Sequence, residues 1–156
     1  MIDDAEFKFA MSHFTSGVTV VTTEHDGRPF GMTVASFASL SLHPPLVLVC
    51  IEKSVKSHEA ITAVGRFAVS ILSQEQGEIS NRFASRVEDK FEGIEIRRTA
   101  NGIPTIARAL TTLECDLRDQ FPGGDHSIFV GEVIAISTTE GAPLVYFRSG
   151  YRSLEA

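Results

Sequence analysis

Residues 31–50 read GMTVASFASLSLHPPLVLVC and divide into two parts of opposite character. The first part is rich in small hydroxyl-bearing side chains, namely Thr33, Ser36, Ser39 and Ser41. The second part follows two prolines and is an apolar run without alternation, which predicts a strand covered on both faces. A packed core has no need of so many hydroxyls beside a buried strand, because each buried hydroxyl must be hydrogen-bonded. The stretch therefore predicts a hydroxyl-lined segment that holds a bound molecule rich in hydrogen-bond acceptors.

The composition is typical of one globular domain, which we expect to span residues 1–156. The chain is 43% hydrophobic and 22% charged, with a formal net charge of −6. Because no basic block is present, this charge disfavours a nucleic acid as partner. The longest apolar run, 46–51, is too short to cross a membrane, and the acidic start MIDDAEFKFA is unlike a signal peptide. We therefore expect a cytoplasmic protein with no membrane association.

The two cysteines, Cys50 and Cys115, both fall within strand-like segments. Buried free thiols are favoured over a disulfide or a catalytic pair. The sequence contains no CxxC, no HExxH and no cluster of His and Cys at ligand spacing. We therefore predict no protein-bound metal.

Hydrophobic periodicity predicts about seven strands with two or three helices between them. Phe7, Met11 and Phe14 lie on one face of a helix that we expect to end at Gly17. We expect further helices over 54–64 and 73–85. We expect one strand to begin at Phe30 and others to span 18–23, 46–51, 66–72, 109–121, 127–138 and 143–147. Residues 88–108 should form short strands and loops. Hairpin-type spacing, as around the turn at 26–27, favours a mainly β fold, an antiparallel barrel with peripheral helices, over a doubly wound sheet.

The sequence carries no self-contained set of catalytic groups. There is no GxSxG, no GxGxxG and no P-loop, and none of the five histidines has a neighbouring nucleophile at a recognisable spacing. An enzyme without its own nucleophile or metal usually borrows the chemistry of a cofactor. The segment 31–41 suits a flat heteroaromatic cofactor, since Gly31 allows close backbone approach and hydroxyls flank it. The alternative is an exposed edge strand rich in Ser and Thr.

Two further segments support a cofactor site. In EKSVKSHEAI, residues 52–61, Lys53 and Lys56 flank two serines at a helix start, which predicts an anion site. The alternative is that Ser54 or Ser57 only caps the helix while the lysines are solvated. In PGGDHSIFVGEV, residues 122–133, a Gly-Gly turn before His126 suits a cleft in which a second ligand passes close to the backbone, although a lone His there can also be purely structural.

With these segments in view, the sequence resembles the short-chain flavin reductase family. The resemblance runs from FTSGVTVVTT near the start to PLVYFRSGYRSL at the end, and it includes KSHEAI, SNRFA, DKFEGI and GGDHSIFVGEV in the same order and spacing. It implies a six-stranded antiparallel FMN-binding split barrel of Greek-key type, normally a homodimer. It also implies FMN or FAD as cofactor, NADH or NADPH as reductant and a separate flavin-dependent monooxygenase as partner.

The resemblance assigns roles to particular residues. It places the flavin ring and ribityl chain along Met32, Thr33, Val34, Ala35, Ser36 and Ser39, beside Cys50 and Ile51. It assigns the phosphate side to Lys56, Ser57, His58 and Lys90, and a covering helix to Arg82, Phe83 and Ala84. It places His126 at the nicotinamide, which this residue would orient, and Tyr146, Arg148 and Tyr151 along the same side.

Two positions depart from the family pattern. Ala35 stands where members usually carry Asn, which removes an amide from the polar edge of the flavin. Gly150 stands where a basic residue commonly follows, which leaves NADH and NADPH equally open.

The expected activity is hydride transfer from nicotinamide to flavin, with reduced flavin passed to the partner oxygenase. Neither cofactor requires an activated side chain for that step, so the protein supplies stacking, distance and backbone donors. The alternative function is a non-catalytic flavin-binding or carrier protein. A pyridoxal-phosphate-related oxidase shares the barrel but matches the motifs less well.

Overall fold

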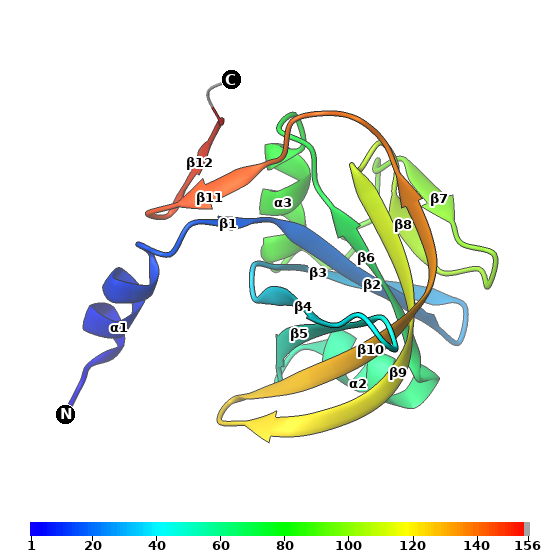
Figure 1. The fold of residues 1–156 in the computed structure, drawn as a ribbon, viewed down its shortest axis with the longest axis horizontal. Coiled ribbons are helices and arrows are strands. Elements are labelled where there is room, and N and C mark those ends of the chain that lie inside the picture. The colour runs from blue at the N-terminus through cyan, green and yellow to red at the C-terminus, as the bar shows by residue number, and fades with distance from the viewer. Residues whose placement is uncertain (155–156) are drawn as a thin grey trace.

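The computed structural model describes residues 1–154, which form a barrel-like sheet with two helices against it and a third that projects from it (Figure 1). The helices are α1 (Asp4–Met11), α2 (Lys56–Val64) and α3 (Gly77–Ala84). The strands are β1 (Ser16–Gly17), β2 (Thr19–His25), β3 (Arg28–Val34), β4 (Phe37–Ser41), β5 (Leu46–Glu52), β6 (Arg66–Ile71), β7 (Ile96–Arg98), β8 (Pro104–Ile106), β9 (Thr111–Gly123), β10 (His126–Thr138), β11 (Val145–Phe147) and β12 (Gly150–Arg152).

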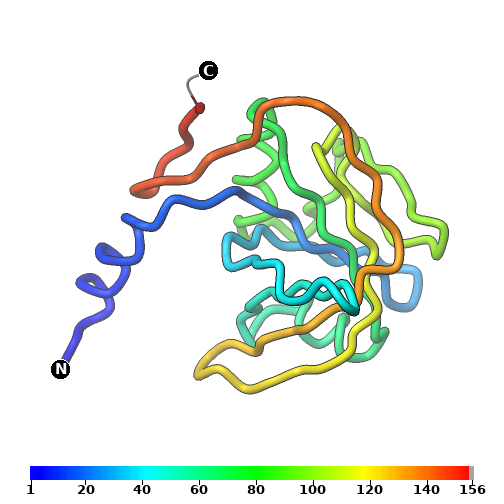
Figure 2. The backbone as a smooth tube through the Cα atoms, viewed as in Figure 1, coloured from blue at the N-terminus to red at the C-terminus, as the bar shows by residue number. Residues whose placement is uncertain are grey.

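The main sheet is antiparallel throughout and rolls around one core. Its strand order is β3-β2-β6-β9-β10-β5-β4, so it has seven strands where the family resemblance implies six. Val34 on β3, near one edge, and Val49 on β5, near the other, belong to the same buried cluster as Phe129 on β10. The two ends of the sheet therefore approach each other, as the continuous tube in Figure 2 shows. The expected mainly β barrel with peripheral helices is confirmed.

Local sequence signals explain the turns of the barrel. The β2–β3 hairpin turns at Asp26 and Gly27, which both have positive φ (51° and 71°). An Asp-Gly pair suits this two-residue turn, because Gly adopts positive φ without strain and Asp tolerates it better than most residues. Gly65 ends α2 in the left-handed conformation, and its N–H donates to the carbonyl of Ile61 at 2.8 Å.

The strand β5 is buried on one face only. Val47, Val49 and Ile51 are buried, whereas Leu46, Leu48 and Cys50 between them are half-buried. The expectation of a strand covered on both faces is therefore wrong for the outer face, because α2 packs mainly against β2, β3 and β6.

The two cysteines differ in their surroundings. Both are free thiols, but Cys50 is half-buried and only Cys115 is buried as predicted. Burial, together with the neighbouring carboxylates of Glu114 and Asp116, raises the pKa of the Cys115 thiol to about 12. Cys115 is thus a core side chain and a poor nucleophile.

The helix α1 extends away from the barrel, and β11 and β12 lie on the same side (Figure 1). It ends at Met11 and not at Gly17, which lies in β1. Beyond Ser12 the N–H groups of His13 and Phe14 reach only three residues back, to the carbonyls of Ala10 (3.2 Å) and Met11 (3.0 Å), so the α-helical hydrogen bonding stops. None of its residues is buried, and Phe7 and Phe9 are 57% and 60% exposed. Within residues 1–154, every helix falls short of the length and apolarity that a membrane crossing requires.

Candidate functional site

Two grooves lie along the seam between β3 and α3. The basic groove, about 350 Å³, lies between the start of β3, the start of α2 and the loop 85–91. The tyrosine groove, about 510 Å³, lies between the end of β3, α3 and the β11–β12 hairpin, where it is lined by Tyr146 and Tyr151. Gly31 lines the first groove and Thr33 the second. Because residues two apart on a strand share a face, the two grooves lie on the same face of β3.

Gly31 allows α3 to lie directly on β3. A Cβ at this position would stand 2.8 Å from Cε1 of Phe83 and 3.2 Å from Cζ of Phe91. These two rings meet edge to face with their centroids 5.0 Å apart. The absence of a side chain on Gly31 therefore sets the height of α3 and of the loop after it.

Polar contacts tie α3 to both sides of the tyrosine groove. The hydroxyl of Thr33 donates to the carbonyl of Ser80 at 2.6 Å. The hydroxyl of Tyr151 lies 2.7 Å from Oγ of Ser80 and 2.8 Å from Oδ1 of Asn81. A phenol has one proton, so Tyr151 donates to Asn81 and accepts from Ser80. The first half of α3 is thereby fixed between β3 and β12.

The small hydroxyls of the segment 31–41 are partly used by the protein itself. Besides Thr33, Ser36 donates its hydroxyl to the carbonyl of Cys50 at 3.0 Å, and the N–H of Cys50 donates to the carbonyl of Ser36 at 3.1 Å. Their oxygen atoms remain as acceptors, whereas their protons are already donated. A bound molecule rich in acceptors would therefore depend more on backbone N–H groups here than the sequence suggested.

The basic groove suits an anion. Its lining includes four basic side chains, Arg28, Lys56, Arg86 and Lys90, and two acidic ones, Glu88 and Asp89. The helix α2 starts in this groove behind Val55, with no side-chain cap. An uncapped helix start presents free N–H groups and a positive dipole end to a phosphate.

The idea that a serine only caps α2 is wrong. Ser54 donates its hydroxyl to Glu52, and Ser57 lies one residue inside the helix.

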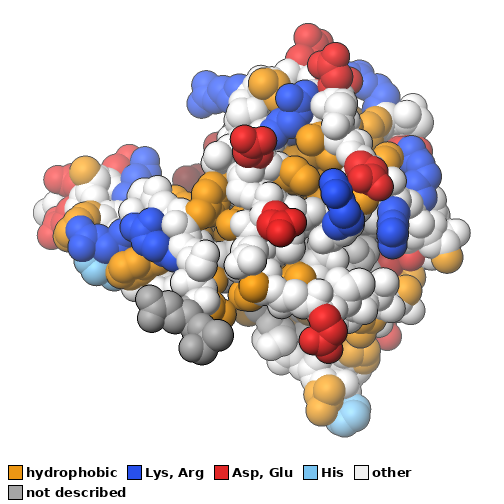
Figure 3. All heavy atoms as spheres, turned by 90° about the horizontal axis from the view of Figure 1, so that it is seen from above, with side chains coloured by type: hydrophobic (Ala, Val, Ile, Leu, Met, Phe, Trp, Pro, Cys, Tyr) orange, Lys and Arg blue, Asp and Glu red, His pale blue; other side chains and the backbone are white. Residues whose placement is uncertain are grey.

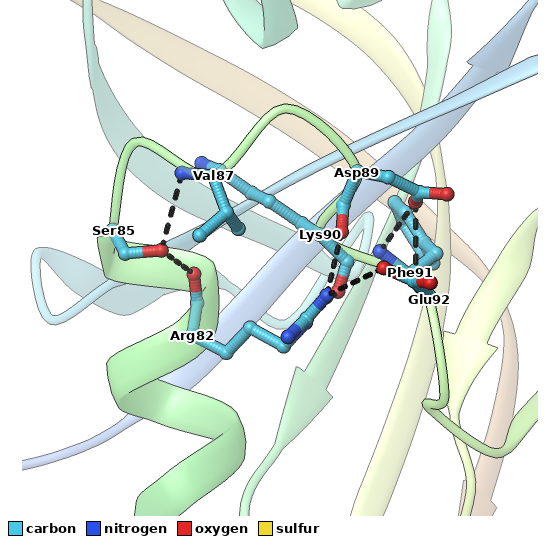
Figure 4. Close-up of polar contacts among 7 residues, drawn as sticks. All are labelled: Arg82, Ser85, Val87, Asp89, Lys90, Phe91 and Glu92. Atoms are coloured by element: carbon cyan, nitrogen blue, oxygen red, sulfur yellow. Dashed lines mark hydrogen bonds and ion pairs between the residues drawn. The ribbon is translucent and has the colours of Figure 1, made fainter.

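The loop 85–92 is held by Arg82, as Figure 4 shows. The Arg82 guanidinium donates to the carbonyl of Lys90 at 2.8 Å and to that of Asp89 at 2.7 Å. The carboxylate of Asp89 accepts the N–H groups of Phe91 (3.0 Å) and Glu92 (3.1 Å). Arg82 therefore shapes the wall of the basic groove, and its charge is directed at this loop.

Lys90 lies at the junction of β3 and α3. Its ammonium donates to the carbonyl of Phe83 at 2.9 Å and to that of Gly31 at 3.2 Å. Burial lowers the pKa of Lys90 from its ordinary value. Since an ammonium has three donors, one remains for a ligand in the basic groove.

A second polar cluster surrounds the turn before β10. Nδ1 of His126 lies 2.8 Å from the carboxylate of Asp125, and this hydrogen bond lowers the pKa of Asp125. Lys53, which directly follows β5, holds this turn. Its ammonium donates to the carbonyl of Gly124 at 2.6 Å, and its backbone N–H donates to the carbonyl of Asp125 at 3.0 Å. The turn that carries His126 is thus attached to the same chain segment that leads into α2.

His58 faces this second cluster and lines neither groove. Its Nε2 lies 2.9 Å from the hydroxyl of Ser127, and its ring packs edge to face on Phe129 with the centroids 4.9 Å apart. Burial, together with the charge of Lys53, lowers the pKa of His58. His58 therefore connects α2 to β10.

The structure brings together about half of the residues that the sequence singled out. Those that line the tyrosine groove are Thr33, Ala35, Ala84, Tyr146 and Tyr151, and those that line the basic groove are Lys56, Ser57 and Lys90. Those in the core or packed against it are Met32, Val34, Ile51 and Phe83. Ser39 is exposed on β4. Arg148 lies on the β11–β12 turn, its guanidinium 5.5 Å from the ring centroid of Phe9 in α1.

The groove residues that sequence reasoning missed include Ser80, Asn81, Arg28 and Arg86. Helical spacing would have found the first two, because positions 80, 81 and 84 share a face of α3. Arg86 lies two residues after the end of α3, in the loop 85–92.

A rolled antiparallel sheet with a basic groove and a tyrosine-lined groove along one seam defines a barrel with room and positive charge for a phosphorylated, planar molecule. No group of three metal-ligating side chains occurs in residues 1–154. The chain belongs to the flavin reductase family: the family model described as flavin reductase like domain matches residues 11–155.

Individual relatives agree with this family. The chain is 40% identical to the reductase subunit HsaB of a flavin-dependent monooxygenase from Mycobacterium tuberculosis, over 99% of this chain and 84% of that protein. It is 39% identical to the reductase component of a nitrophenol monooxygenase from Rhodococcus opacus, over 96% and 80%. Among solved structures, the NADH:FAD oxidoreductase SgcE6 of Streptomyces globisporus, in complex with NAD and FAD fragments, superposes with a TM-score of 0.94 at 36% identity, over 98% of this chain and 93% of that one.

Proposed function

We propose that this protein transfers hydride from NADH or NADPH to FMN or FAD and supplies the reduced flavin to a separate monooxygenase. The observation that carries the proposal is the basic groove, because it offers an uncapped helix start and four cations to the phosphate of a flavin. A second groove, of a size that takes a planar ring system, lies further along the same face of β3. The reductases similar to this chain serve monooxygenases according to their names.

Lys56 and Lys90 would hold the phosphate side of the flavin, and the start of α2 would donate its free N–H groups. The backbone of residues 33–36, with the Thr33 and Ser36 hydroxyls as acceptors, would border the ring. When bound, the flavin supplies the acceptor for hydride. The chain itself would fix distance and orientation and exclude water from that face.

We assign His126 to the orientation of the nicotinamide. Its Nδ1 is paired with Asp125, which leaves Nε2 as the ring nitrogen that faces away from this partner. Tyr146 and Tyr151 border the tyrosine groove and would line the same side, whereas Arg148 lies beside α1. Arg148 would reach a nicotinamide only if α1 and the β11–β12 hairpin come to lie over a cleft.

We further propose a homodimer. The exposed apolar residues of α1 and the segment after it are Phe7, Phe9, Met11 and Phe14, which are 54–80% exposed. They lie on a projecting arm, visible at the left of Figure 3 with apolar side chains among charged ones. Apolar residues gathered on such an arm are typical of a contact with a second chain.

Sedimentation velocity tests the dimer. We expect twice the monomer mass for the unaltered chain and a monomer for Phe14→Asp. Val64→Asp, an equal change on exposed α2, is the matched control. A monomeric unaltered chain would refute the dimer.

Anaerobic mixing of the protein, a flavin and a nicotinamide tests the reaction. We expect the flavin absorbance to bleach with NADH or NADPH. Comparing the four combinations of FMN or FAD with NADH or NADPH identifies the preferred flavin and the preferred nicotinamide. Tight binding of flavin without bleaching under either reductant would instead establish a flavin carrier. The chain's position in the family makes turnover the expected result.

A further inference from the structure

A third groove lies away from the β3–α3 seam, between the β7–β8 hairpin and the outer face of β9 and β10. Its volume is about 540 Å³, and it shares no lining residue with the basic or the tyrosine groove. This volume lies within the range of small-molecule sites in proteins. We call it the Glu114 groove.

The floor of the groove contains a buried carboxylate with an unsatisfied oxygen. Leu113 and Cys115 point into the barrel core, so Glu114 between them points to the opposite face, toward the hairpin. Glu114 is 1% exposed, and its Oε1 accepts a hydrogen bond from Nδ2 of Asn101 at 2.6 Å. Its Oε2 is buried and has no hydrogen-bond partner. A buried acceptor without a donor costs free energy, so it indicates that a donor belongs at this position.

The rim of the groove is basic. Arg97, Arg98 and Arg108 line it, together with one acidic side chain, Glu140. Arg98 pairs with Glu24 at 2.8 Å and Arg108 with Glu95 at 3.5 Å, whereas Arg97 makes no ion pair within residues 1–154. Figure 3 shows Lys and Arg side chains gathered among apolar ones on the side where β7 lies.

We propose that the Glu114 groove binds a small organic anion that also carries a hydroxyl group. The hydroxyl donates to Oε2 of Glu114, and the anionic group pairs with Arg97. The apolar body of the molecule lies against Ile106 and Ile136, which also line the groove. A cation would be repelled by Arg97, which has no acidic partner within residues 1–154, and an anion without a donor would be repelled by the Glu114 carboxylate.

The test uses three probes on the flavin-loaded protein: para-hydroxybenzoate, benzoate without the hydroxyl, and phenol without the carboxylate. We expect calorimetry to show para-hydroxybenzoate binding about tenfold more tightly than either, the effect of one hydrogen bond to a charged group. The flavin absorbance should stay unchanged. Equal affinity for the three probes would mean that water fills the groove and would overturn the proposal, as would displacement of the flavin.

Two variants locate the probe. Glu114→Gln keeps the shape but replaces the charged acceptor with a neutral amide nitrogen, which can only donate to the phenol oxygen, so para-hydroxybenzoate should lose most of its advantage over benzoate. Arg97→Gln should reduce binding of both acids, whereas Arg118→Gln, a change of the same kind on exposed β9, should not. Unchanged affinity in Glu114→Gln and Arg97→Gln would overturn the proposal. If Glu114→Gln fails to fold, the affinities of the three probes for the unaltered chain still test the proposal.

Discussion

The hydroxyl of Tyr151 lies 2.7 Å from Oγ of Ser80, which joins the β11–β12 hairpin to α3, the helix that borders the tyrosine groove. The same hydroxyl reaches Asn81, and the carbonyl of Ser80 accepts the hydroxyl of Thr33. The tyrosine groove is therefore bounded by three segments, from β3, α3 and β12, that hold one another in place through Ser80.

We expect Tyr151→Phe to widen this groove. Losing both hydrogen bonds should lower the free energy of unfolding by about 1–2 kcal/mol and weaken flavin binding several-fold, because α3 is no longer fixed to β12. Urea unfolding and flavin fluorescence titration measure the two effects. Tyr146→Phe, which removes a hydroxyl from the same groove that makes no hydrogen bond within residues 1–154, should change neither.

Lys56→Gln should reduce affinity for the flavin phosphate specifically. Lys56 is the first residue of α2 and lines the basic groove, so its charge adds to that of the helix start. We expect FMN to bind roughly tenfold more weakly, as for the loss of one charge-assisted hydrogen bond, while riboflavin, which has no phosphate, binds as before.

Fluorescence titration with both flavins measures this ratio. Lys8→Gln on α1 is the control. An equal loss for FMN and riboflavin would place the phosphate elsewhere.

His126→Ala should raise the KM for the nicotinamide much more than it changes flavin affinity. The residue is the first of β10, is paired with Asp125 and directly follows the turn that Lys53 holds; it lines neither groove on the β3–α3 seam. Anaerobic stopped-flow kinetics at varied NADH give the KM, and fluorescence gives the flavin affinity. Comparable losses of both would count against the assigned role, and His25→Ala, on the exposed β2–β3 hairpin, should leave both unchanged.

Some of this arrangement follows from local sequence and some does not. The Asp26-Gly27 turn and the end of α2 at Gly65 are specified by residues within a few positions, so sequence predicts them. The partner of the Thr33 hydroxyl, in contrast, is 47 residues away. Sequence showed that hydroxyls gather at this point but not that the protein itself accepts their protons.

Arg82 illustrates the same limit. The resemblance of the segment SNRFA to the flavin reductase family assigns Arg82 to a helix that covers the flavin. In the structure, its guanidinium holds the loop that carries Lys90. A loop without periodicity gives no signal for such a contact. Only the folded chain shows that the Arg82 guanidinium donates to carbonyls of the loop, whereas Lys90 lines the basic groove.

Gly31→Ala should destabilise the fold, because the new Cβ would stand 2.8 Å from the ring of Phe83. Overpacking of this kind costs about 1–3 kcal/mol. Urea unfolding measures the loss, and combining the change with Phe83→Leu should recover part of it. Gly17→Ala, where no atom lies within 4 Å, is the matched control and should stay within about 1 kcal/mol of the unaltered chain.

His58 should make stability depend on pH. Burial and the charge of Lys53 hold its pKa below the ordinary value of 6.5. At pH values well above 6.5, His58 is neutral in both the folded and the unfolded chain, so it contributes no pH dependence to stability there. As the pH falls through the ordinary value toward the lowered one, the unfolded chain takes up a proton first, and the free energy of unfolding decreases.

We therefore expect the decrease between about pH 7.5 and about pH 5.5 to be smaller in His58→Asn, which keeps a polar partner for Ser127 but does not titrate. Urea unfolding at the two pH values measures the difference. His25→Asn on the exposed hairpin should retain the full decrease. If His58→Asn loses stability on acidification as steeply as the unaltered chain, the contact between α2 and β10 through His58 is not the source of the pH dependence.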